Sequence, residues 1–295
     1  MTGPERGFLL LCSHLGDPER KCLTTAQFRR LAQRVKHAEK TTEDRELIPA
    51  DLKALGYGPE EAERIVILLS EEDRLDRYLR RAEKAGCGVL TRFSGHYPRE
   101  LEQRLGQDAP PVLWYKGDPA LLDGPKIALV GSRELLPENA FFAHQAGIQA
   151  TRQGFALVSG NAKGADRTAQ DGCLESGGRV ISIVADALED HKTADNILWL
   201  SEDSFDLGFS SIRALSRNRL IHSIGVATLA AQSSLKTGGT WDGSVKNLRF
   251  GWTPLFCFDD GRESTALLAQ MGAELIGLDA LEDLSALAHF GNCLF

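Results

Sequence analysis

The 295-residue sequence lacks the features that mark a membrane or secreted protein. No apolar run approaches the roughly 20 residues that a membrane-spanning helix needs. The opening residues, MTGPERGFLLLCSHLGD, have neither a basic start nor a long apolar centre, so they are not typical of a signal peptide. We therefore expect a cytoplasmic protein with no membrane partner.

Clustered cysteines and an excess of positive charge are also missing. The six cysteines lie far apart and form no CxxC pair, which predicts reduced, mostly buried thiols and no metal or other cofactor. The formal net charge is −7, so the chain repels polyanions at long range. A local basic groove can still act within about one Debye length, roughly 10 Å. The charge weighs against nucleic-acid binding without excluding it.

What is present is an ordinary globular composition, with 42% hydrophobic and 25% charged residues. Residues 1–85 have helical spacing of apolar side chains, with a Thr24/Thr25 cap before one helix and Pro59 in the first turn of another. Gly86 is a typical helix stop. These patterns predict a small N-terminal helical domain over 1–85.

From residue 126 onward, apolar strand patterns alternate with helical patterns, after a connector that includes a short strand at 87–93. Such alternation predicts an α/β domain over 86–295, built on a doubly wound, mostly parallel, Rossmann-like sheet. The expected strands cover 126–131, 155–160, 179–185, 226–231, 254–258 and 273–277. The expected helices lie near 137–153, 164–176, 242–250 and 279–288.

Ligands of such sheets bind beyond the carboxyl ends of the strands, and the first loop there is GSRE. Gly131 permits a sharp turn, Ser132 can cap or donate a hydrogen bond, and Arg133 is a forked cation suited to phosphate. No GxGxxG follows the strand, so the dinucleotide fingerprint is absent. A plain turn with a solvated arginine is the alternative.

The second loop is LVSGNAKGADRTAQDG, at 157–172. Ser159 and Gly160 end a strand, Lys163 adds a charge, and Gly164 opens a helix whose N-terminus attracts anions. Asp166 is an awkward neighbour for a phosphate, so we interpret it as a residue that organises the loop through backbone N–H groups. The Walker spacing is absent, and a turn that merely needs glycine remains an alternative.

The third loop, SSLKTGGTWDG, again joins small residues, hydroxyls and a cation before a helix. An RNR segment adds two arginines, which on a helix face could also be simply solvated. Three such loops after strands of one sheet should face one crevice, and a polyphosphate, a nucleotide or a nucleic-acid backbone would fit it. The predicted residues here are Arg217, Asn218, Arg219, Lys236, Thr237, Gly238, Gly239 and Thr240.

The order LVGSR, VSGNAKGAD, SRNRLI and KTGGT resembles the DNA-processing protein A family, also called DprA or Smf. The preceding HYPRELEQRLGQDAPPVLWYKGD is similar to the lead-in of that family. The resemblance covers roughly residues 85–260 and does not extend to a C-terminal winged-helix domain. Gln170 and Gln232 depart from the family, which often has a histidine and an acidic residue at those places.

The resemblance implies a non-enzymatic binder of single-stranded DNA that acts in DNA uptake and natural transformation. It further implies loading of a RecA-type recombinase and a homodimer. It makes the three loops and the RNR segment the DNA-binding rim, with Ser132 and Arg133 as phosphate contacts. Trp241 is a candidate for stacking on a base, or otherwise a core or rim tryptophan.

Two other functions remain open from the sequence. A nucleotide-hydrolysing enzyme of the Lonely Guy type would use an acidic residue near a Gly-Gly-Thr loop, and Asp242 follows Gly239–Thr240. A carboxylate of Asp242 that points into the pocket would favour this enzyme, and a solvated one would count against it. An interaction scaffold that binds a regulatory nucleotide without turnover is the third possibility.

Overall fold

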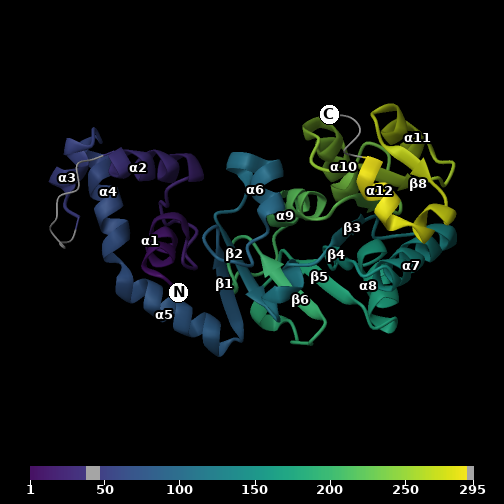
Figure 1. Cartoon of the computed structure of the whole chain (residues 1–295), viewed down its shortest axis with the longest axis horizontal. Helices are drawn as coiled ribbons and strands as arrows, with labels where there is room; N and C mark the ends of the chain where they lie inside the picture. Colours follow the sequence, from purple (N-terminus) through teal and green to yellow (C-terminus); the bar gives the residue numbers. More distant parts are fainter. Residues whose placement is uncertain (38–46, 291–295) are drawn as a thin grey trace.

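The computed structural model describes residues 1–37 and 47–290 (Figure 1). Its first part is helical, as predicted for 1–85. Positions 38–46 of that prediction lie outside the described residues, as do 291–295, which include Cys293. The helices are α1 (Gly3–Cys12), α2 (Thr25–His37), α3 (Pro49–Ala54), α4 (Pro59–Ser70) and α5 (Glu72–Lys84).

Local capping explains where these helices begin and end. Before α2, the backbone N–H of Gln27 donates to Thr24 Oγ1 at 3.2 Å, and the Thr24 N–H donates to Gln27 Oε1 at 3.0 Å. This reciprocal capping box satisfies amides that the first helical turn leaves free. Pro59 is the first residue of α4, and Gly86 follows α5 with a φ of +70°. The predicted caps and stop are confirmed.

Within the described residues, the chain forms a nine-stranded sheet with the order β1-β2-β6-β5-β4-β3-β7-β8-β9. Every pair of neighbouring strands from β6 to β9 in this order is parallel. Strand β2 pairs antiparallel with both β6 and the edge strand β1. The mostly parallel α/β sheet is therefore confirmed. The strands are β1 (Cys87–Thr91), β2 (Val112–Lys116), β3 (Lys126–Val130), β4 (Ala156–Ser159), β5 (Arg179–Ile183), β6 (Ile197–Ser201), β7 (Thr228–Ala230), β8 (Leu255–Phe258) and β9 (Glu274–Ile276).

The central strands bury both faces under helices. On β3, Ile127 and Leu129 pack with α7, α8 and α12, whereas Ala128 and Val130 pack with α6, α9, α10 and α11. Helices α8 and α9 lie on opposite sides of β4 and β5 (Figure 1). These helices are α6 (Arg99–Leu105), α7 (Pro137–Arg152), α8 (Ala165–Glu175), α9 (Ser211–Ile224), α10 (Gly238–Phe250), α11 (Glu263–Gln270) and α12 (Leu284–Phe290).

The sequence prediction missed some elements, among them helices α6, α9 and α11. Strand β6 was not predicted, because it follows β5 after a charged loop with no helical pattern between the two strands. The connector before residue 126 supplies β2, which joins the sheet. The last predicted helix is broken into the 3₁₀ turn η4 (Asp279–Glu282) and α12, since Asp283 between them has a non-helical backbone, with a φ of −137° and a ψ of 83°. The other 3₁₀ turns are η1 (Gly106–Asp108), η2 (Pro119–Leu122) and η3 (Leu188–Asp190).

The N-terminal helices share a hydrophobic core with the β1–β2–β6 end of the sheet. Phe8 and Tyr78 lie in the same buried cluster as Trp114 and Phe205, and the Tyr78 ring packs edge-on against Trp114 at 5.2 Å. Tyr78 also donates a hydrogen bond from its hydroxyl to Asp206 Oδ1 at 2.8 Å. The helical part therefore packs firmly on the sheet. The predicted boundary after residue 85 stays a prediction.

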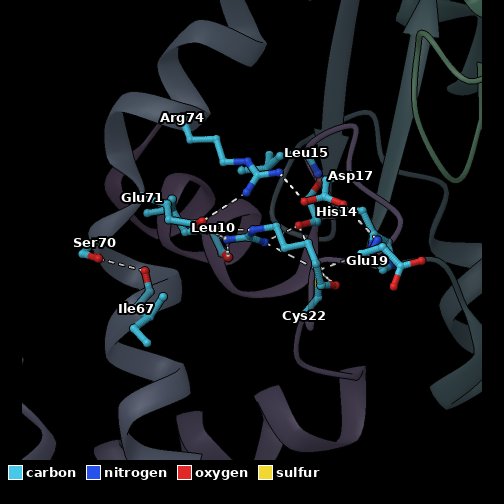
Figure 2. A network of polar contacts seen from close by, with 12 residues as sticks. Leu10, His14, Leu15, Asp17, Glu19, Cys22, Ile67, Ser70, Glu71 and Arg74 are labelled. Atoms are coloured by element: carbon cyan, nitrogen blue, oxygen red, sulfur yellow. Dashed lines mark hydrogen bonds and ion pairs between the residues drawn. The ribbon is translucent and has the colours of Figure 1, made fainter.

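A network of ion pairs fixes the loop after α1 to the junction of α4 and α5. Arg74 reaches from α5 to Asp17 Oδ2 at 2.8 Å and to Glu71 Oε1 at 3.2 Å (Figure 2). The buried Arg20 pairs with Glu71 Oε2 at 2.7 Å and donates to the Leu10 carbonyl at 2.6 Å. This loop lies next to the segment that precedes β2 and lines a shallow second pocket with it.

Candidate nucleic-acid interface

A cavity of about 870 Å³ opens at the carboxyl ends of β3, β4 and β7, beside α9. Residues of all three predicted loops line it, so the structure brings them to one crevice. A pocket of this size, at the crevice of an open α/β sheet, is a typical ligand site. The predicted residues that line it are Gly131, Ser132, Arg133, Asp166, Arg217, Asn218, Thr237, Gly238, Gly239 and Thr240.

The first loop is packed directly on the start of α8. A Cβ at Gly131 would lie 2.3 Å from the Cβ of Ala165, which explains why this position needs glycine. The backbone N–H of Ser132 donates to the Gln232 carbonyl at 2.9 Å, so the loop is also tied to the loop after β7. Arg133 is exposed at the rim of the pocket. Its guanidinium is therefore free to meet an anion.

Glycine in the second loop permits a close approach of two protein backbones. Gly164 has a φ of +88°, and a Cβ there would lie 2.4 Å from the carbonyl oxygen of Arg133. The N–H of Ala165 donates to the Ser132 carbonyl at 3.1 Å. Because this amide at the N-terminus of α8 is already bonded to the first loop, it is not free to bind an anion. The arginines are therefore the stronger anion-binding groups of the pocket.

Asp166 organises the second loop, as predicted. Its buried Oδ2 accepts hydrogen bonds from the backbone N–H groups of Gly160, at 3.0 Å, and Ala162, at 3.2 Å. Burial raises the pKa of this carboxyl, and the positive charge of Arg217 opposes the rise. The two charged groups thus face each other across the turn that ends β4.

Arg217 dominates the electrostatics of the pocket. Its side chain projects from α9 and is only 7% exposed, yet Nε and Nη1 have no hydrogen-bond partner among the described residues. A Cβ at Gly160 would lie 1.6 Å from Nη1, so glycine makes room for the guanidinium. Burial lowers the pKa of Arg217, but the ordinary pKa of a guanidinium is so high that the group stays charged. A desolvated cation with free donors is a strong anion site.

The third loop is held against α9 by Asn218. The Nδ2 of Asn218 donates to the carbonyl of Gly239 at 3.1 Å. Gly238, with a φ of +83°, and Gly239 form the first turn of α10, which begins four residues before the predicted start at 242. Thr237 is exposed just before this helix and lines the pocket. Small residues here leave the mouth of the cavity open.

Six predicted residues lie outside the lining of this pocket. Ser159 is buried and accepts a hydrogen bond from Gln170 Nε2 at 2.5 Å, so the departure at Gln170 supports the core. Arg219 pairs with Glu202 at 2.5 Å and lines the second pocket, of about 490 Å³. Lys163 and Lys236 are exposed beyond the lining residues. Gly160 makes room for the Arg217 side chain, and Gly164 permits close packing on the backbone of the first loop.

Two further sequence candidates, Trp241 and Asp242, do not reach the cavity. Trp241 is half-buried and packs against the core beneath α10, which confirms the core alternative. Asp242 is 43% exposed at its side chain and pairs with Lys246 Nζ at 2.7 Å. A partly solvated carboxylate away from the cavity lining counts against the nucleotide-hydrolysing enzyme.

The structure adds pocket residues that the sequence analysis missed. Phe209 and Leu215 border the mouth and are 62% and 47% exposed. His222 lies at the buried side of the lining, where burial lowers its pKa to about 3 and keeps the ring neutral. The two apolar residues were missed because no element was predicted between the strands expected at 179–185 and 226–231, and both Phe209 and helix α9, which carries Leu215, lie there. Their only signal is a few apolar side chains scattered through a polar stretch.

Other kinds of site find little support in the described parts of the chain. Residues 1–37 and 47–290 contain no group of three or more His, Cys, Asp or Glu side chains arranged to hold a metal ion. In the same ranges, every helix is too short or too polar to span a lipid bilayer. The cysteines of these ranges are free thiols, and all but Cys22 are buried.

Comparisons with known proteins find DNA processing proteins among the relatives of this chain. The chain is 31% identical over 152 residues to the DNA processing protein DprA of Streptococcus pneumoniae and 28% identical over 177 residues to that of Bacillus subtilis. These alignments cover 48% and 56% of this chain, and only 53% and 59% of the two relatives. The chain therefore spans little more than half the length of these curated relatives.

Solved structures share the fold. The S. pneumoniae DprA structure has a TM-score of 0.65 at 22% identity and aligns with 86% of this chain and 95% of its own. A Helicobacter pylori DprA structure, determined to explain its single-stranded DNA binding mode, has a TM-score of 0.56 at 24% identity, covering 70% and 95%. The family model for DNA recombination-mediator protein A matches residues 88–277. The chain belongs to the DNA recombination-mediator protein A family.

Proposed function

We propose that this chain binds single-stranded DNA, without catalysing a reaction, at the pocket between the three loops and α9. The observation that carries the proposal is Arg217, a buried cation that lines the cavity and has two nitrogens without a hydrogen-bond partner in the described part of the chain. A backbone phosphate would satisfy those donors and compensate the desolvated charge. Arg133 at the rim supplies a second phosphate contact.

The shape of the site favours a single strand over a duplex. Arg217 is nearly buried, so a phosphate can meet it only if part of the strand enters the cavity. A flexible single strand can bend its backbone inward, whereas a stiff duplex resists such deformation. With an overall charge of −7, attraction is confined to this local site, and binding should weaken steeply with salt.

Family membership supports the wider role. We infer that the chain acts in DNA processing during DNA uptake and natural transformation, and that it passes the bound strand to a RecA-type recombinase. We also infer that it works as a homodimer. The support for these inferences is the recombination-mediator family and its DNA processing relatives. Light scattering of the purified chain tests the dimer, and a recombinase filament assay on coated single strands tests the transfer.

The binding proposal is tested by fluorescence anisotropy of a labelled oligo-dT strand across a salt titration. Duplex DNA and a nucleoside monophosphate serve as competitors. We expect tight, salt-steep binding that neither competitor displaces. Displacement by the mononucleotide at similar concentration, or its hydrolysis, would contradict the proposal and favour a nucleotide-binding protein.

A pair of variants localises the binding. Arg133→Ala removes the exposed guanidinium at the rim and should weaken binding by about 1.5–3 kcal/mol, the scale of a charge-assisted contact. Arg152→Ala is the matched control, because Arg152 is also an exposed arginine, at the end of α7, and does not line the pocket. Equal losses in both variants would show that binding is only a general effect of charge.

A further inference from the structure

Phe209 is an exposed aromatic ring at the mouth of the pocket. It is 62% exposed and borders the same cavity as the buried Arg217. Leu215, from the second turn of α9, adds an apolar side chain to this border. We propose that the face of Phe209 stacks on a base of the bound strand, an inference that rests on the proposed function.

The loop that carries Phe209 is fixed from within the protein. Arg213 Nη1 donates to the carbonyls of Leu207, at 3.0 Å, and Gly208, at 2.6 Å, directly before the phenylalanine. Arg213 Nε also pairs with Asp203 Oδ2 at 2.6 Å. The ring is therefore exposed to solvent on a backbone that these hydrogen bonds hold in place. A preorganised aromatic loses little conformational freedom when a ligand covers it.

The charge beside the ring identifies its occupant. An apolar peptide segment would cover Phe209 but would leave Arg217 desolvated without an anion. An inorganic anion would satisfy Arg217 and leave the ring exposed. A nucleotide unit joins an anionic phosphate to a flat base and so fits both groups. The aromatic partner that the sequence analysis sought at Trp241 is thus provided by Phe209.

The inference is tested with two strands of equal length, oligo-dT and a strand of abasic sugar–phosphate units. Phe209→Ala should weaken binding of oligo-dT by about 5- to 150-fold, the range for loss of one base–aromatic stack. Binding of the abasic strand should not change. Phe209→Trp should keep the affinity for oligo-dT. Phe209→Leu, which is apolar but has no aromatic face, should lose most of it.

The control variant is Phe141→Ala, because Phe141 is 53% exposed on α7 and does not line the cavity. It should bind both strands as the wild type does. The inference is overturned if Phe209→Ala binds oligo-dT as tightly as the wild type, or loses both strands equally. If the Arg217 contact still proves necessary in that case, the proposed function survives and only stacking fails. Failure of the wild type to bind either strand would overturn both.

Arg213 serves in this scheme as a positioning residue. Arg213→Gln should lower the affinity for oligo-dT and leave that for the abasic strand unchanged, because it frees the loop that presents the ring. In a Phe209→Ala background, the same substitution should have no further effect on oligo-dT. Additive losses in this double-mutant cycle would show that Arg213 acts independently of the ring.

Discussion

Replacement of Arg217 probes the origin of DNA affinity most sharply. The guanidinium is 7% exposed, and two of its nitrogens lack hydrogen-bond partners in the described structure. Arg217→Met keeps much of the side-chain length and removes the charge and all donors. One charge-assisted contact contributes about 1.5–3 kcal/mol, so the affinity for oligo-dT should fall by about 10- to 150-fold.

Arg217→Lys separates the charge from the donor geometry. Lysine keeps the positive charge near Asp166 but has no planar fork of N–H groups. The dependence of log affinity on log salt should therefore match the wild type for Arg217→Lys. In Arg217→Met, the slope should be smaller by about 0.7, the value for one single-strand phosphate contact. Anisotropy titrations at several salt concentrations measure both quantities.

Stability measurements complete this test. Arg217→Met leaves the buried carboxyl of Asp166 without its facing charge, so thermal unfolding at neutral pH should occur at a lower temperature. The double variant Arg217→Met with Asp166→Asn should recover stability without recovering DNA binding. Wild-type affinity in a folded Arg217→Met protein would refute the reasoning, because a buried cation that lines the site would then make no contact with DNA.

Substitutions at four further positions test the same structure. Gly160→Ala should displace the Arg217 guanidinium, so it should both weaken oligo-dT binding and lower the melting temperature, because its Cβ would lie 1.6 Å from Nη1. Gly147→Ala should lower the melting temperature without changing the intrinsic DNA affinity, because its Cβ would lie 2.0 Å from the Ala169 carbonyl oxygen in the α7–α8 contact, away from the pocket. Asp166→Ala should destabilise the fold, whereas Asp166→Asn keeps a hydrogen-bond acceptor for the loop. Because the folded-state pKa of Asp166 is raised, the wild type should lose stability as pH rises from about 3.9 through that pKa, and Asp166→Asn should not show this loss. The folded-state pKa of His222, about 3, lies below its ordinary 6.5, so the unfolded state binds the extra proton as pH falls through this window. Denaturant unfolding should show a loss of about 1.4 kcal/mol per pH unit there, and a flatter profile in His222→Gln.

Much of the fold is predictable from the sequence because the central strands are buried on both faces. Apolar runs such as KIALV and FALVS are typical of parallel strands covered by helices, and they mark β3 and β4. The run ILWLS of β6 is as long as KIALV and nearly as buried, but no α-helix separates it from β5, so the alternation of strand and helix patterns does not mark it. Its pairing with β2 depends on residues far away in the chain.

The site is predictable in its loops but less so in its individual contacts. Arg217 and Arg219 are two positions apart on one helix, so their side chains point in widely different directions. One faces the cavity and the other pairs with Glu202, and only the packing of α9 decides which. Likewise, the sequence indicates that Gly164 permits a close approach, but not that the approaching group is the protein's own first loop.

Photocross-linking of the wild-type protein to an oligo-dT strand carrying 5-iododeoxyuridine tests the central claim most directly. The cross-linked tryptic peptides can be identified by mass spectrometry. Binding in the pocket predicts cross-links to the peptide of residues 193–213, which carries Phe209, and their loss in Arg217→Met. Cross-links confined to helices α1–α5 or to the second pocket would contradict the claim that this crevice holds the strand.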